Sequence, residues 1–232
     1  NKRFNQLTKI SLVLIYLVII AGAIVRMTGS GMGCPDWPKC FGYLIPPTES
    51  SQLMFKSFHD YNKGEMILLN SENFYTAIKD FKSEELINLN NWNLFEKHDY
   101  VVYDPVHTWI EYINRLIGAL AGIPILFFTL ISIYHWKDYK YLTIVSILTV
   151  FGMGFQAWLG KTVVDSNLAP YKITVHMLMA LVIVALILVL IVQTKKVNKL
   201  DNQLFKNLVI FSIILTLVQV AIGTQVREFV DE

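Results

Sequence analysis

The run ITVHMLMALVIVALILVLIVQ, from Ile173 to Gln193, contains no Asp, Glu, Lys or Arg. It is long enough to cross a bilayer as a helix, which takes about 20 apolar residues. The sequence holds five long apolar runs: Ile10–Val25, Trp109–His135, Tyr141–Val164, Ile173–Gln193 and Leu204–Val226. Hydrophobic residues make up 54% of the 232 residues and charged residues only 16%, against about 25% charged in soluble domains. The sequence therefore predicts an all-α fold, a polytopic transmembrane helical bundle with five spans.

The short loops predict how these spans are oriented. Basic residues precede the first span and lie in the loops at 135–140 and 194–206. The positive-inside rule places these segments, and with them the N-terminus, in the cytoplasm. Residues 27–108 and 161–172 are then on the outer side. The first run has no small-residue cleavage site after it, so we interpret it as a retained helix. The net charge of +2, without a basic stripe, argues against binding of nucleic acid.

Both cysteines of the chain lie in the first outer loop. Cys34 and Cys40 are six positions apart, with Pro35 and Pro38 between them. Cysteines on the oxidising side of a membrane most often form a disulfide. The spacing is not the CxxC of a thioredoxin-like couple, and two sulfurs without a nearby histidine give only half of a zinc site. We predict a disulfide, and its role is open between a structural and a redox one.

Residues 46–104 form a polar insertion in this outer segment. Within Ser71–Leu89, near-helical spacing is shown by Phe74, Ile78, Phe81 and Leu86. This pattern predicts a helix opened by Ser71 and Glu72. We expect it to cap the outer face of the bundle.

The second span carries the densest set of polar side chains of any span. Spacings of 4, 3 and 4 residues place on one helical face His107, Glu111, Asn114 and Gly118. Charged residues inside a span are costly and by default functional. A second interpretation is an ion pair between Glu111 and Arg115, which are four residues apart.

The fourth span places His176 well inside the membrane. Three roles are open: a proton relay, an interhelical hydrogen bond, or an axial ligand to a heme. His176 and Asn114 each lie about 8 Å below the start of their helix. We therefore expect the two to face the same layer, where a planar ligand fits between helices. Gln156 of the third span also needs a partner inside the bundle.

The first and fifth spans share a short pattern. IIAGAIVRM aligns with LTLVQVAIGTQVREF so that Gly22, Val25 and Arg26 match Gly223, Val226 and Arg227. The match predicts a duplicated four-helix unit. Residues 1–193 are then an N-terminal half with an outer insert at about 27–106. Residues 204–232 are the first helix of a second half whose remainder is missing, so we expect a longer protein.

The two matching arginines, Arg26 and Arg227, lie at equivalent outer ends of their spans. Arginine binds carboxylates as a bidentate fork, and a heme presents two propionates. We therefore expect these arginines to clamp the carboxylates of a ligand held in the predicted layer.

Four segments together resemble the heme A synthases. They are TGSGMGCPDWPKCFG (Thr28–Gly42), WIEYINRLIGA (Trp109–Ala119), TVHMLMAL (Thr174–Leu181) and IGTQVRE (Ile222–Glu228). The resemblance covers most of the chain apart from the insert at 46–104. The cysteine loop is its most specific part.

The resemblance implies an eight-helix enzyme of two halves in the bacterial inner membrane. Such an enzyme oxidises the C8 methyl group of heme O to the formyl group of heme A. One half holds a heme b cofactor, and the N-terminal half binds heme O. Heme O synthase and terminal oxidase assembly factors are the implied partners.

The same resemblance assigns roles to residues of this chain. His176 becomes an axial ligand of the heme iron, Glu111 the catalytic carboxylate, and Cys34–Cys40 the loop disulfide. The residues expected to bind the heme are His176, Asn114, His107, Arg26, Arg115 and Arg227.

One position departs from the family pattern. Asn114 stands where the family has a histidine before Arg115, and asparagine is a poor iron ligand. His107 is about 10 Å away along the helix, so a heme ligated by His176 alone is an alternative. A non-enzymatic membrane heme carrier or oxidase-assembly protein is therefore the second function to consider. A quinone-linked disulfide oxidoreductase is disfavoured because CxxC is absent.

Overall fold

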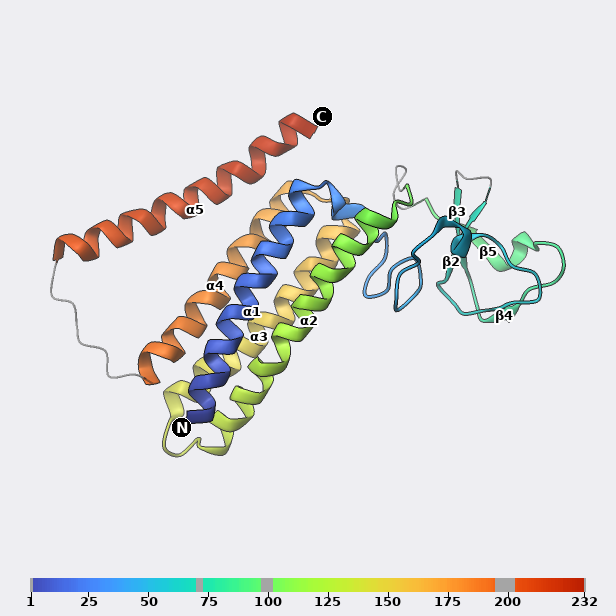
Figure 1. Cartoon of the computed structure of the whole chain (residues 1–232). Coiled ribbons are helices and arrows are strands. Elements are labelled where there is room, and N and C mark those ends of the chain that lie inside the picture. Colours follow the sequence, from blue (N-terminus) through green and yellow to red (C-terminus); the bar gives the residue numbers. More distant parts are fainter. Residues whose placement is uncertain (1, 70–72, 97–101, 195–202, 232) are drawn as a thin grey trace. The chain divides into compact units, whose positions relative to one another are not determined.

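The structure is a computed structural model that describes residues 2–69, 73–96, 102–194 and 203–231, with the side chains of the last helix described up to Val226. Five long helices account for most of these residues (Figure 1): α1 Lys2–Met27, α2 Pro105–Tyr134, α3 Lys140–Asp165, α4 Pro170–Thr194 and α5 Gln203–Asp231. Each is long and apolar enough to cross a membrane. The prediction of an all-α transmembrane fold with five spans is therefore confirmed.

The chain folds into two compact units. One consists of residues 1–20 and 117–232, and the other of residues 21–116. The first is built from helices. The second contains the end of α1, the start of α2 and the whole segment between these helices.

The helical unit has an apolar core with few but well-placed polar contacts. Phe4 of α1 meets Phe128 of α2 edge to face, with ring centroids 5.6 Å apart. The hydroxyl of Thr143 on α3 donates to the Ser132 carbonyl of α2 at 2.8 Å. Hydroxyl-to-carbonyl bonds of this kind join helices where lipid offers no hydrogen-bond partner.

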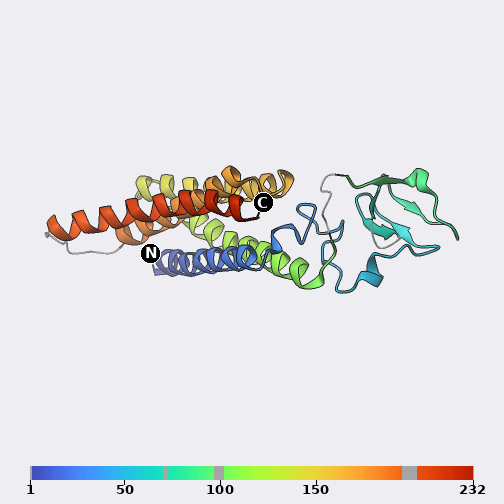
Figure 2. The same cartoon turned by 90° about the horizontal axis from the view of Figure 1, so that it is seen from above.

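Helices α3 and α4 lie side by side in both views (Figures 1 and 2). Gly152 of α3 allows this approach, because a Cβ atom there would lie 3.1 Å from the Met179 Cε atom of α4. Small residues at such points let transmembrane helices pack closely. The seam between α3 and α4 is therefore narrow, and the polar groups along it are held near one another.

The second unit contains short antiparallel strands. One pair joins β1 (Asp60–Tyr61) to β4 (Phe81–Lys82), and a three-stranded sheet in the order β2-β3-β5 joins Met66–Leu69, Asn73–Ala77 and Trp92–Leu94. Short 3-10 turns cover Ser30–Met32, Ser50–Leu53 and Leu89–Asn91. Buried side chains under the strands form two clusters, one around the disulfide and one around Tyr61 and Trp92.

The helix predicted for Ser71–Leu89 is wrong. Strand β3 occupies part of that range, and Phe74 is buried in the sheet, whereas Ile78 is 41% and Leu86 is 80% exposed. The near-helical spacing therefore does not define one buried face. The segment NFYTA is rich in aromatic and β-branched residues that favour strands. Ser71 and Glu72, expected to open the helix, lie outside the described residues.

A glycine at position 42 is required by the second unit. Gly42 has a φ of +82°, and a Cβ atom there would collide with the Gly64 carbonyl. Gly29 also has a positive φ, +70°, but faces open space. A side chain at position 29 would therefore cause backbone strain alone, whereas one at position 42 would cause both strain and a steric collision.

We expect Gly42→Ala to destabilise the second unit more than Gly29→Ala does. Left-handed strain costs about 1–2 kcal/mol for alanine, and overpacking adds about 1–3 kcal/mol at position 42 alone. Thermal unfolding, monitored by protease cleavage between residues 43 and 96, measures the loss of stability in each variant. Equal losses would contradict the collision with Gly64.

Candidate functional site

Helix α2 begins at a strong capping residue. The Asp104 carboxylate accepts the N–H groups of Val106 at 2.7 Å and His107 at 3.0 Å, and Pro105 follows it. Acidic caps and proline at the first helical position are both typical of helix starts. The N–H groups lower the pKa of Asp104, led by that of His107. The first turns of α2 are thus fixed, and they carry the polar face predicted from the sequence.

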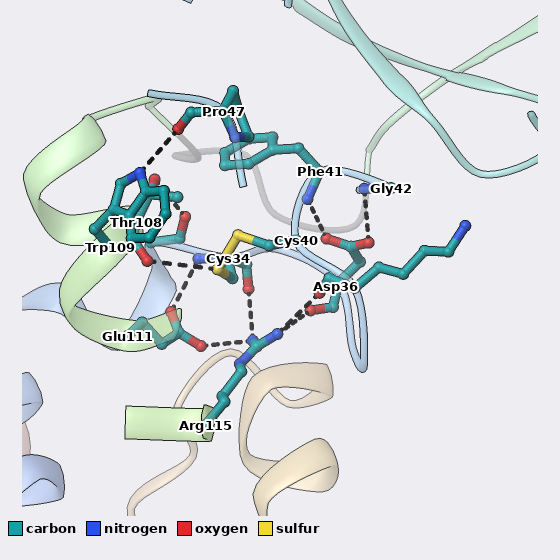
Figure 3. The surroundings of a disulfide bond; sticks show 12 residues. Cys34, Asp36, Cys40, Phe41, Gly42, Pro47, Thr108, Trp109, Glu111 and Arg115 are labelled. Atoms are coloured by element: carbon teal, nitrogen blue, oxygen red, sulfur yellow. Dashed lines mark hydrogen bonds and ion pairs between the residues drawn. A yellow bond between two sulfur atoms is a disulfide. The ribbon is translucent and has the colours of Figure 1, made fainter. Parts of the chain in front are cut away.

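Glu111 is 4% exposed, and both of its carboxylate oxygens have donors (Figure 3). Oε1 accepts from Arg115 Nη2 at 2.6 Å, and Oε2 accepts the backbone N–H of Cys34 at 2.9 Å. The ion pair weighed from the i,i+4 spacing is therefore present. It also reaches beyond the helix, because its second oxygen holds the loop with the cysteines.

Arg115 binds this loop through backbone carbonyls (Figure 3). Its Nη1 group donates to the carbonyls of Asp36 at 2.8 Å and Lys39 at 2.9 Å, and Nη2 donates to that of Cys34 at 3.2 Å. With the bond to Glu111, four hydrogen bonds use the two terminal nitrogens. Only a planar, multidentate guanidinium matches such an arrangement.

The predicted Cys34–Cys40 disulfide is confirmed. The loop that it closes, residues 33–43, is called the cysteine loop below. Inside it, the Asp36 carboxylate accepts the N–H groups of Phe41 at 2.6 Å and Gly42 at 2.9 Å. Burial raises the pKa of Asp36, while these N–H groups and Arg115 oppose the shift. Folding thus favours the protonated form, and that contribution is lost as the pH rises through the raised pKa.

The cysteine loop also contacts α2 one turn above Glu111. The Thr108 hydroxyl donates to the Gly33 carbonyl at 2.8 Å. A side chain at position 33 would collide with the backbone of His107. The sequence did not single out Asp36 or Thr108, because each acts through contacts with backbone groups distant along the chain.

Asn114 lies on α2 between Glu111 and Arg115, which both bind the cysteine loop. Its Oδ1 atom is buried and has no hydrogen-bond partner among the described residues. A Cβ atom at Gly22 would lie 3.9 Å from it, so the amide faces α1. His107 and Arg26 are half-buried in this unit. The side chain of Arg227 lies outside the described residues.

His176 sits at the α3–α4 seam of the helical unit. The Gln156 amide donates to the His176 carbonyl at 3.0 Å and lies 3.4 Å from the imidazole Nε2. Gln156 thus finds the partner that the sequence required. A Cβ atom on Gly160 would lie 3.4 Å from His176 Cε1. The expected layer shared with Asn114 stays a prediction, because the two residues belong to different units.

The surroundings of His176 fit an axial heme ligand. Its Nδ1 atom is buried without a hydrogen-bond partner among the described residues, as is Gln156 Oε1. The other ring nitrogen, Nε2, lies 3.4 Å from the Gln156 amide, so an iron bound at Nε2 would take the place of that contact. In the described part of the chain, no three His, Cys, Asp or Glu side chains cluster to hold a separate metal ion.

A polar contact also joins α4 to α5 near His176. The hydroxyls of Thr174 and Thr224 are 2.6 Å apart, and the Gln225 amide donates to Thr174 at 3.4 Å. These residues lie in the segments TVHMLMAL and IGTQVRE quoted above. The two segments therefore meet in the fold.

The model of the COX15-CtaA family, described as cytochrome oxidase assembly protein, matches residues 5–81 and 94–231. The chain belongs to this family. Its curated relatives include the heme A synthase of Shewanella oneidensis, 26% identical over 193 residues, which are 83% of this chain and 46% of the relative. The resemblance to heme A synthases is thereby confirmed, and the chain is a multi-pass membrane protein.

Two further heme A synthases give the same result. That of Orientia tsutsugamushi is 30% identical over 184 residues, covering 75% of this chain and 43% of the relative. That of Pelagibacter ubique is 26% identical over 219 residues, covering 90% and 56%. The chain thus spans about half the length of the curated relatives it matches. No solved structure matches it.

We expect Arg115→Lys to loosen the cysteine loop. Lysine cannot bridge three carbonyls and Glu111 together, and loss of a hydrogen bond to a charged group costs about 1.5–3 kcal/mol. Amide hydrogen exchange of residues 34–42 measures the effect. Lys39→Met is the matched control, because it changes a side chain but keeps the carbonyl that Arg115 binds. Unchanged exchange in Arg115→Lys would contradict the anchoring role.

Proposed function

We propose that this chain is the heme O-binding, N-terminal part of a heme A synthase. The reaction is oxidation of the C8 methyl group of heme O to a formyl group, which makes the protein a membrane oxidoreductase. The observation that carries the proposal is the family match over residues 5–81 and 94–231. The position of His176 beside Gln156 at the α3–α4 seam also supports it.

The proposal includes a location and an orientation. The protein spans the bacterial inner membrane, with the N-terminus in the cytoplasm and the cysteine loop outside. Basic residues of the short loops support this orientation. The Cys34–Cys40 disulfide agrees with it, because disulfides persist on the oxidising side of the membrane.

His176 is proposed to hold the iron of heme O. Gln156 fixes its backbone carbonyl, and Gly160 leaves space beside the ring. A heme b in the second half, when bound, supplies one-electron redox chemistry.

Glu111 is proposed to accept a proton during oxidation of the methyl group. Removing electrons from a methyl carbon also releases protons, and a positioned carboxylate takes them up. Both oxygens now have donors, Arg115 at Oε1 and the Cys34 N–H at Oε2. Proton transfer therefore requires one oxygen to release its donor, which couples the chemistry to the cysteine loop.

The decisive experiment is heme analysis of cells that make heme O and the full-length protein. Formation of heme A supports the enzyme. Folded protein that binds heme without forming heme A overturns it in favour of a membrane heme carrier or oxidase-assembly protein, in keeping with the family's description.

We expect His176→Ala to remove the heme of the N-terminal half, which would lower Soret absorbance by about half if each half ligates one heme. His135→Ala is the control, because that ring contacts the Ile131 carbonyl at the far end of α2. An unaltered Soret band in His176→Ala would show that the residue is only structural.

We expect Glu111→Gln to lower heme A formation by about 100-fold or more, the usual worth of a proton-transfer group, while bound heme remains. Arg115→Lys disturbs the same ion pair but keeps the carboxylate, so it should retain activity within about tenfold. Equal loss in both variants would instead assign Glu111 to anchoring the loop. Extracted hemes and Soret absorbance report the two quantities separately.

A further inference from the structure

Lys172 lies one helical turn before His176 on α4. Residues four apart share a helix face, and both of these side chains contact α3. The Lys172 ammonium group donates to the Thr162 carbonyl at 3.3 Å, while His176 contacts Gln156 and Gly160. The cation and the imidazole therefore border the same α3–α4 seam, about 6 Å apart along the helix axis.

The turn before α4 fixes where this cation lies. Asn167 and Leu168 adopt left-handed backbone conformations, with φ of 60° and 61°. Their N–H groups donate to the carbonyls of Val164 and Val163 at the end of α3. Such conformations are unusual for residues other than glycine. They close the α3–α4 turn tightly and bring Lys172 back onto α3.

The contacts described for the Lys172 side chain are with neutral groups. They are the Thr162 carbonyl and the face of Tyr171, whose centroid is 6.0 Å away. An ammonium group has three donors, and a half-buried charge is best compensated by an anion. Lys172 is thus suited to bind a carboxylate presented along the seam.

Arg115, one of the residues expected to bind the heme, is committed elsewhere. The terminal nitrogens of Arg115 already bind Glu111 and three carbonyls of the cysteine loop. Lys172 lies on the same helix as the proposed iron ligand and is nearer to the N-terminal end of that helix. A tetrapyrrole carries its two carboxylates on one edge, and that edge faces the aqueous boundary most favourably.

We propose that Lys172 binds a propionate of the heme ligated by His176 and so sets the orientation of the ring. This inference rests on the proposed heme-binding function of the chain. Lys172 is a positioning residue, because it touches the substrate away from the carbon that reacts. The recognised chemistry is a carboxylate on a flat, apolar ring.

The test compares two probes, ferric protoporphyrin IX and its dimethyl ester, which lacks the carboxylate charges. Each is titrated into the full chain in nanodiscs, followed by Soret absorbance. Binding in the His176→Ala background is subtracted. We expect Lys172→Met to weaken binding of the free acid about tenfold, as befits a hydrogen bond to a charged group, and to leave the ester unchanged. Lys172→Arg should restore the affinity for the free acid.

Lys161→Met is the matched control, because Lys161 is an exposed lysine near the same turn, and it should change neither affinity. Unchanged affinity for the free acid in Lys172→Met, with His176-dependent binding intact, overturns this inference alone. Equal weakening for acid and ester also overturns it, since the effect is then on the fold. Absence of His176-dependent binding in the unsubstituted chain overturns the proposed heme site as well.

Discussion

The buried ion pair between Glu111 and Arg115 is the constraint on which the unit of residues 21–116 depends. Removing one partner of such a pair costs about 3–5 kcal/mol, because the other charge stays buried without compensation. Here each partner also binds the backbone of the cysteine loop. The disulfide closes that loop covalently, but the ion pair attaches it to α2. Loop, helix start and insert are thereby organised around two charged side chains.

This arrangement changes how the carboxylate is understood. An acidic residue inside an apolar helix suggests catalysis. Yet the geometry gives Glu111 a structural task that occupies both oxygens. The proposed proton transfer is compatible with this task only when one of these oxygens releases its donor. In that case Glu111 links the position of the cysteine loop to the capacity of the proposed site to accept a proton.

The helical unit follows a different design. Polar groups along the α3–α4 seam are few, and two buried atoms, His176 Nδ1 and Gln156 Oε1, have no partner among the described residues. Unpaired polar atoms in an apolar setting are costly, which agrees with the heme proposed to bind beside His176. Lys172, one turn before His176, adds a charge to the same seam. The proposed iron ligand and a cation on one helix suit a molecule with a metal centre and acidic substituents.

The sequence by itself determined the five spans, because runs of about 20 apolar residues have no other stable placement. Local spacing also raised the Glu111–Arg115 ion pair as one of two interpretations, and two cysteines on one loop predicted the disulfide. Only the tertiary structure decided that the insert forms strands, since strand pairing joins residues distant along the chain, as Tyr75 with Leu94. It also decided which loop groups bind Glu111 and Arg115, and these lie 76 to 81 residues away. The spacing of polar residues in the sequence indicates which face of a helix is polar, whereas the tertiary structure determines which residues contact that face.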